Sequence, residues 1–170
     1  MRHRADEAFA SFIGERGTKR VPLEDWASLA RVPLVMRGAA EAAMAMQRSN
    51  LVVTDGGDAT RAYDAACKTV CDAFADLEDR LAAPQQPKNP ALASAVADLD
   101  MIHGSASRHA ALRGAIGGYA DAHRTDATAV PRTMALAFAA GWVAYLAHVR
   151  VTAEPALDDV ATQADVAWWR

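Results

Sequence analysis

DATRAYDAACKTVCDAFADLEDRLAA, residues 58–83, is the stretch of sequence that decides the fold. Its large apolar side chains recur at alternating steps of four and three residues. They are Tyr63, Cys67, Val70, Phe74, Leu77 and Leu81. This spacing keeps them on one side of an α-helix, and most of the residues between them are charged or small. The stretch therefore predicts a long amphipathic helix that needs a partner surface.

Most of the remaining chain repeats this design. The composition is 52% hydrophobic but only 6% aromatic, and alanine, the best helix former, is abundant. Further helices are expected at about 5–16, 22–33, 33–48, 90–103, 106–123, 131–149 and 155–170. A length of 170 residues suits one domain. The sequence thus predicts an all-α, compact multi-helix bundle of about six to eight helices, a single helical domain over 1–170.

Proline, glycine and asparagine mark the expected breaks. Pro33 should end the second helix, and Asn50 with residues 55–58 has the chemistry of a turn. Residues 84–89 are the clearest break and could separate two sub-bundles. Beyond them, Asn89 is placed to cap a helix that starts at Pro90.

Charge and hydropathy favour a cytoplasmic protein. The formal net charge is −3, and no apolar run follows the basic N-terminal residues as it would in a secretory signal. The most apolar run, 133–147, is shorter than the roughly 20 residues that cross a bilayer. A buried core helix is therefore expected, and no association with a membrane is predicted. Arginine outnumbers lysine fifteen to three, which together with abundant alanine indicates a bacterial or phage origin.

One cluster could bind a metal. Asp100 and His103 stand three positions apart, a spacing that carboxylate and imidazole ligands use on bundle helices, and His109 follows the break at Gly104. The alternative is that the aspartates face solvent and His103 borders the core. No cofactor is predicted.

Catalytic signatures are lacking. The chain has no Gly-x-Ser-x-Gly elbow, and the glycines at 114–118 match no phosphate-binding loop. Asp72, Asp76 and Asp79 superficially suit magnesium, but the alternating charges beside them are typical of a solvated helix face. No catalytic residue is assigned.

The two cysteines, Cys67 and Cys71, are four positions apart on one predicted helix, which suits a disulfide poorly. Cys67 is expected to be a small core residue. Aromatic residues at Phe138, Trp142 and Tyr145 could instead line a pocket for a small molecule.

Three function classes remain open. The leading hypothesis is a non-enzymatic helical protein that acts through self-association or partner binding, as a homo-oligomer or on a protein partner. Trp168 and Trp169 would contribute, because adjacent helix residues point about 100° apart and one should face outward. The first alternative is a metal-dependent or small-molecule-binding enzyme or sensor at Asp98–His109. The second is a DNA-binding accessory protein, since 23–32 loosely resembles the first helix of a helix-turn-helix. Nucleic acid is disfavoured because the chain has no concentrated basic stripe.

Overall fold

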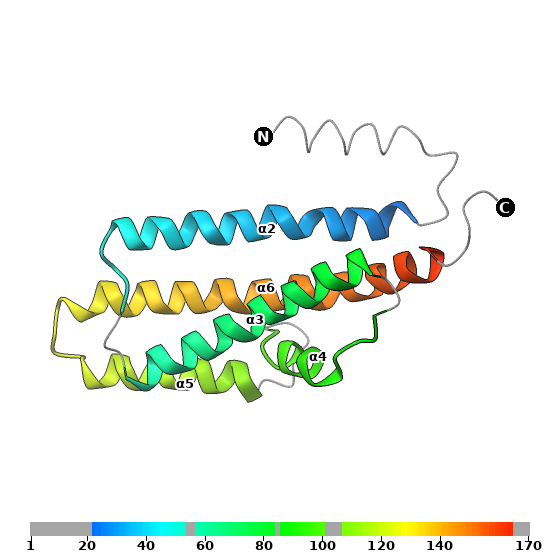
Figure 1. Cartoon of the computed structure of the whole chain (residues 1–170). Coiled ribbons are helices and arrows are strands. Elements are labelled where there is room, and N and C mark those ends of the chain that lie inside the picture. Colours follow the sequence, from blue (N-terminus) through cyan, green and yellow to red (C-terminus); the bar gives the residue numbers. More distant parts are fainter. Residues whose placement is uncertain (1–21, 54–56, 84–85, 101–106, 165–170) are drawn as a thin grey trace.

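The computed structural model describes residues 22–53, 57–83, 86–100 and 107–164. Within these ranges the regular structure is entirely helical (Figure 1). The helices are α2 (Leu23–Arg48), α3 (Asp58–Ala82), α4 (Pro90–Ala97), α5 (Ser107–Ala122) and α6 (Ala129–Ala164). The all-α prediction is confirmed, and the expected count of six to eight is slightly too high for the described part of the chain. The helix expected at 5–16 lies outside the described residues.

Two prolines account for the overcount. Pro33 was expected to end a helix and Pro155 to begin one, but each lies inside a continuous helix, α2 and α6 respectively. A proline inside a helix removes one backbone N–H and leaves a carbonyl without its partner. Both prolines are exposed, and the packing of the rest of each helix favours continuity.

Helix α6 is the central element. It packs against α2, α3, α4 and α5, and in Figure 1 it runs through the middle of the molecule with α2 on one side and α5 on the other. Its buried positions are mostly small, with Ala135, Ala139, Ala140, Ala144 and Ala147 all shielded from solvent. Small side chains let the neighbouring helices approach closely from several directions.

The seam of α3 is confirmed as a packing surface, with one qualification. Val70, Phe74 and Leu77 are buried in the core, whereas Tyr63 and Cys67 are half-buried and Leu81 is exposed. Helix α3 contacts α4, α5 and α6, but not α2 to a comparable extent among the described residues. One flank of the seam therefore has no closely packed helical neighbour in the described part of the chain.

The segment after the expected break also agrees with the prediction from the sequence. The side chain of Asn89 accepts a hydrogen bond of 3.2 Å from the backbone N–H of Leu92, and Pro90 occupies the first turn of α4. Val96 and Leu99 are buried against the bundle. Helices on both sides of residue 84 pack on each other, and a single domain over 1–170 stays a prediction.

Helix α6 is longer than the apolar run suggested. Over Ala129–Val160 it is long and apolar enough to cross a membrane, judged by length and composition alone. Half of its most apolar stretch is buried inside the protein. The core helix of a soluble protein can have the same length and composition, so a cytoplasmic location stays a prediction.

Candidate binding groove

An apolar groove runs between α2 and α3. Its floor is formed by α6 through Leu136, Ala139 and Val143, and the link that follows α2 closes one end through Leu51–Val53. The cavity has a volume of about 800 Å³. It exists because α2 packs mainly on α6, so no described helix packs closely on the flank of α3 that faces α2.

The walls of the groove are almost entirely apolar. Helix α2 contributes Val32, Met36, Ala39, Ala40, Ala42, Ala43 and Met46. Helix α3 contributes Tyr63, Cys67, Val70, Cys71, Phe74, Ala75, Leu77 and Leu81. Helix α2 spans 26 residues, yet Val32 is its one fully buried hydrophobic side chain among those described. Much of the apolar surface of α2 is thus directed at the groove or at solvent.

Two carboxylates, Asp64 and Glu78, are the only charged groups among the described residues that line the groove. Both belong to α3 and both are exposed. Neither forms an ion pair or hydrogen bond with another described residue. They stand fourteen positions apart, which is about 21 Å along a helix. The α3 wall therefore carries one unpaired negative charge towards each end.

The groove also holds both cysteines. Cys71 is exposed and Cys67 is half-buried, and both are free thiols. Burial raises the pKa of Cys67, and a hydrogen bond with Tyr63 offsets part of that rise. Burial likewise raises the pKa of Tyr63, with the hydrogen bond to Cys67 adding to it. Both groups are therefore neutral at pH 7, and the Cys67 thiol is a poor nucleophile.

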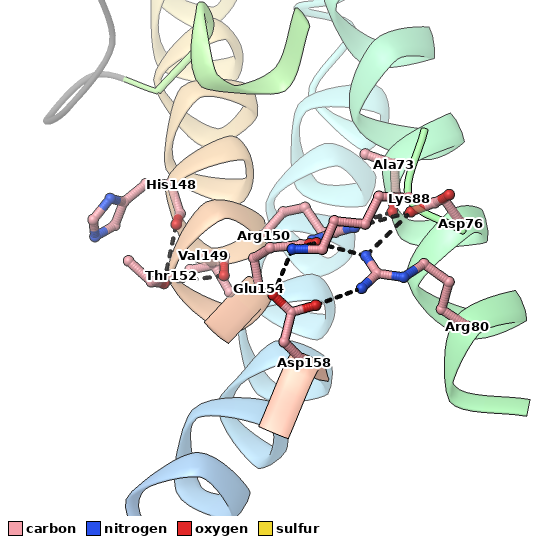
Figure 2. A network of polar contacts seen from close by, with 10 residues as sticks. All are labelled: Ala73, Asp76, Arg80, Lys88, His148, Val149, Arg150, Thr152, Glu154 and Asp158. Atoms are coloured by element: carbon pink, nitrogen blue, oxygen red, sulfur yellow. Dashed lines mark hydrogen bonds and ion pairs between the residues drawn. The ribbon is translucent and has the colours of Figure 1, made fainter. Parts of the chain in front are cut away.

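A second polar feature joins α3 to α6 outside the groove (Figure 2). Arg80 lies 2.6 Å from Glu154 and 2.9 Å from Asp158. Arg150 donates to the carbonyl oxygen of Ala73 at 2.8 Å, lies 3.1 Å from Asp76, and also pairs with Glu154.

Lys88, in the link before α4, completes this network. It lies 3.2 Å from Glu154 and pairs with Asp158, and the bond to Asp158 raises the pKa of the lysine. The network then holds three positive and three negative side chains, so its formal charge is zero. Arg80 and Arg150 are nearly inaccessible to solvent. A neutral, mutually satisfied cluster of this kind is a cross-link between elements and leaves little capacity for a ligand.

Glu154 is the shared acceptor of the two arginines. Burial alone would raise the pKa of this carboxyl, but hydrogen bonds from Arg150 and Arg80 outweigh burial and lower the pKa to about 2. Sequence reasoning missed the network, although Asp76 and Arg80 stand four positions apart, the spacing of a helical ion pair. Their distant partners on α6 gave no local signal.

The three expected metal ligands are only partly described. Asp100, just after α4, is 1% exposed and lies 3.3 Å from Nδ1 of His148 on α6. His109 is half-buried on α5, where its backbone N–H donates to the carbonyl of Asp98. His103 lies outside the described residues. Within the described ranges no group of three or more metal-ligating side chains gathers, so the metal site stays a prediction.

The three expected pocket aromatics lie on α6 and have different surroundings. Trp142 lines the groove and meets Phe138 and Tyr145 edge to ring. Phe138 is 57% exposed, and the Tyr145 hydroxyl accepts a 2.8 Å hydrogen bond from Arg31 of α2. Of the three, Trp142 alone is among the described groove-lining residues. Trp168 and Trp169 lie outside the described part of the chain.

Comparison with known proteins gives no further guide to the site. No family model, no curated protein and no solved structure matches the chain.

Proposed function

We propose that the chain is a non-enzymatic interaction protein that binds an amphipathic α-helix of a protein partner in the groove between α2 and α3. The observation that carries this proposal is the separation of the two walls. Helices α2 and α3 both rest on α6, yet they do not pack substantially on each other. Two helices on one floor helix leave space for a fourth member, as in a four-helix bundle.

The length of the groove supports a helical occupant. The lining residues of α3 run from Thr60 to Leu81 and those of α2 from Val32 to Met46. At 1.5 Å per residue, these walls measure roughly 32 Å and 21 Å. A long apolar trough that is open along one side suits a helix of about 14–20 residues, which would bury one face and leave the other in water.

The chemistry of the lining supports binding over catalysis. The groove offers methyl groups, thioethers, aromatic rings and two neutral thiol or phenol groups. Its lining includes no histidine, lysine or arginine among the described residues. A general acid–base reaction needs groups with suitable pKa values within hydrogen-bond reach of each other, and these walls do not supply them.

The two unpaired carboxylates specify the charge of the partner. Asp64 and Glu78 sit at the edge of an apolar wall, where a cation on the partner would gain attraction at low desolvation cost. The expected partner helix therefore carries apolar residues at helical spacing with basic residues beside them.

A peptide probe tests this proposal. The probe is a labelled 18-residue amphipathic helix of leucine and alanine with two arginines fourteen positions apart, and the control is a scrambled peptide of the same composition. Binding is measured by fluorescence anisotropy, and light scattering follows the oligomeric state. We expect saturable binding of the probe and none of the scrambled peptide.

Two methionines provide a matched pair of variants. Met36 lines the groove and is 43% exposed, whereas Met134 is 69% exposed on α6 and is not among the lining residues. Met36→Glu should weaken probe binding about tenfold or more, because it places a charge on an apolar wall, and Met134→Glu should leave it unchanged. Equal effects of the two variants on probe binding would refute the proposal that the groove is the binding site. If the protein forms a concentration-dependent dimer and Met36→Glu converts it to a monomer, the occupant of the groove is a second copy of the chain.

A further inference from the structure

We infer that Cys67 and Cys71 on the groove wall of α3 form a binding site for one soft monovalent metal ion, Cu(I) in type, which is held between their two sulfur atoms. This site goes beyond the proposed partner binding, because it needs only one wall of the groove and no helical occupant.

The two thiols lie beside each other on one face of α3. Residues four positions apart on a helix have Cβ atoms about 5–6 Å apart and point in similar directions. Both side chains line the groove, and both thiols are free. Burial raises the pKa of Cys67 most, and the nearby Cys71 raises it further, so the two groups are within electrostatic reach of each other. Cys71 is exposed, which gives an ion access from solvent.

This spacing is too wide for a disulfide but suits one intervening ion. A disulfide brings the two Cβ atoms to about 3.5–4.5 Å, with the sulfur atoms bonded directly. A metal–sulfur bond is about 2.3 Å long, so two sulfur atoms that share an ion lie up to about 4.6 Å apart. Cys67 and Cys71 can therefore hold one ion with rotation of their side chains and no change in the helix backbone.

The surroundings of the two thiols favour a soft ion that accepts few ligands. Among the described residues, no third histidine, cysteine, aspartate or glutamate gathers with them. A structural zinc ion takes four ligands in a tetrahedron, whereas Cu(I) is selected by soft thiolate and thioether sulfur and is satisfied by two thiolates in a line. The other sulfur atoms of the groove lining belong to Met36 and Met46, which are also soft donors.

Binding exchanges two protons for the ion. Two thiols and one Cu(I) ion give a thiolate–copper–thiolate unit of charge −1 and two released protons, with no change in oxidation state. Tyr63 supports the thiolate form of Cys67. Burial raises the pKa of Cys67, but the Tyr63 phenol donates a hydrogen bond to the sulfur and lowers it. An outer partner of this kind typically changes metal affinity by about 10- to 100-fold.

A competition titration measures the site in the full-length protein. The reduced protein is titrated with Cu(I) in the absence of oxygen against a chromogenic Cu(I) chelator. X-ray absorption then identifies the atoms around the bound copper, and light scattering follows the oligomeric state. We expect one ion per monomer with sulfur neighbours only. Nitrogen or oxygen neighbours, or a dimer bridged by copper, would overturn the inference.

A matched pair of variants separates the placement of the thiols from their number. Cys71→Ser should weaken Cu(I) binding about 100-fold or more, because the remaining thiol loses its chelating neighbour. Adding Ala65→Cys to Cys71→Ser restores two thiols per chain, but Ala65 is exposed and lies on the opposite side of α3 from Cys67. Binding should not return. Circular dichroism checks that both variants keep the fold, and wild-type affinity in the double variant would contradict the site.

Two further measurements test the chemistry of the site. Tyr63→Phe removes the phenol donor and should weaken Cu(I) binding about tenfold, while the number of bound ions stays at one. Excess Zn²⁺ should not displace Cu(I), because two thiols leave a tetrahedral ion short of ligands. Unchanged affinity in Tyr63→Phe, or displacement of Cu(I) by Zn²⁺, would show that the site is not of the kind inferred.

Discussion

Arg80 of α3 and Glu154 of α6 are joined by an ion pair of 2.6 Å across seventy-four positions of sequence, and Arg150 shares the same carboxylate. Both guanidinium groups are nearly inaccessible to solvent. A buried cation loses hydration on folding, and only a precisely placed anion offsets that loss. Glu154 is therefore the residue on which the connection between α3 and α6 depends most.

Neutralising Glu154 should destabilise the fold strongly. Glu154→Gln keeps the shape of the side chain but leaves Arg80 and Arg150 with an uncompensated charge, so the free energy of unfolding should fall by about 2–4 kcal/mol. Urea denaturation followed by circular dichroism measures this loss. The matched control is Asp72→Asn, which removes an exposed ion pair with Lys68 on α3 and should cost less than about 1 kcal/mol. Comparable losses in the two variants would mean that burial adds nothing to the network.

Acid should weaken the protein through the same carboxyl. The pKa of Glu154 is about 2 in the folded protein and 4.5 as a reference value, so the contribution to stability is complete above pH 4.5 and is lost as the pH falls towards 2. Since a tenfold change in proton affinity corresponds to 1.4 kcal/mol, the full loss is roughly 3 kcal/mol. Thermal unfolding between pH 5 and pH 2 measures it. In Glu154→Gln this part of the acid dependence should be absent, and an unchanged acid profile would contradict the assignment.

Gly38 of α2 should be intolerant of a large side chain. A Cβ added at this position would lie 3.2 Å from Cη2 of Trp142, so a leucine would push the indole out of the groove wall. Gly38→Leu should lower the free energy of unfolding by about 1–3 kcal/mol. Gly141 on α6 has no described atom within 4 Å of an added Cβ, and Gly141→Leu should stabilise the helix by up to about 1 kcal/mol. Thermal unfolding distinguishes the two variants, and equal changes in the free energy of unfolding would show that stability does not depend on the close approach of Gly38 to Trp142.

The cap of α4 should contribute measurably to stability. Asn89→Ala removes the hydrogen bond to the backbone N–H of Leu92 and should cost about 1 kcal/mol. Asn89→Asp retains an acceptor and should recover most of this loss. Chemical denaturation gives both values, and no difference between the two variants would exclude a role for the side chain.

The fold was predictable where the signal is local. The seam from Tyr63 to Leu81 predicted α3 because helical periodicity is written in consecutive residues, and Asn89 with Pro90 predicted the start of α4 for the same reason. Pro33 and Pro155 misled the prediction of helix ends. Their local preference for a break is outweighed by packing over the full lengths of α2 and α6.

The candidate site was not predictable in the same way. Asp64 and Glu78 are exposed on α3, but nothing near them in the sequence indicates that α2 stands away from α3 and leaves a groove beside them. Trp142 was expected to line a pocket and does line the groove, whereas Phe138 and Tyr145 are not among its described lining residues. Which helix flank stays uncovered depends on the order of helices in space, and a single sequence does not encode that order in any short motif.

Among the described residues, α2 packs mainly on α6, and this has a consequence for how the molecule unfolds. The α6 interface is the main tertiary contact described for α2, whereas α3 packs on three other helices, so the amide hydrogens of α2 should be less protected from exchange. Warming should therefore release α2 first and leave a smaller folded remnant. Any molecule seated between α2 and α3 would erase that early step, and the whole bundle would then melt in one transition.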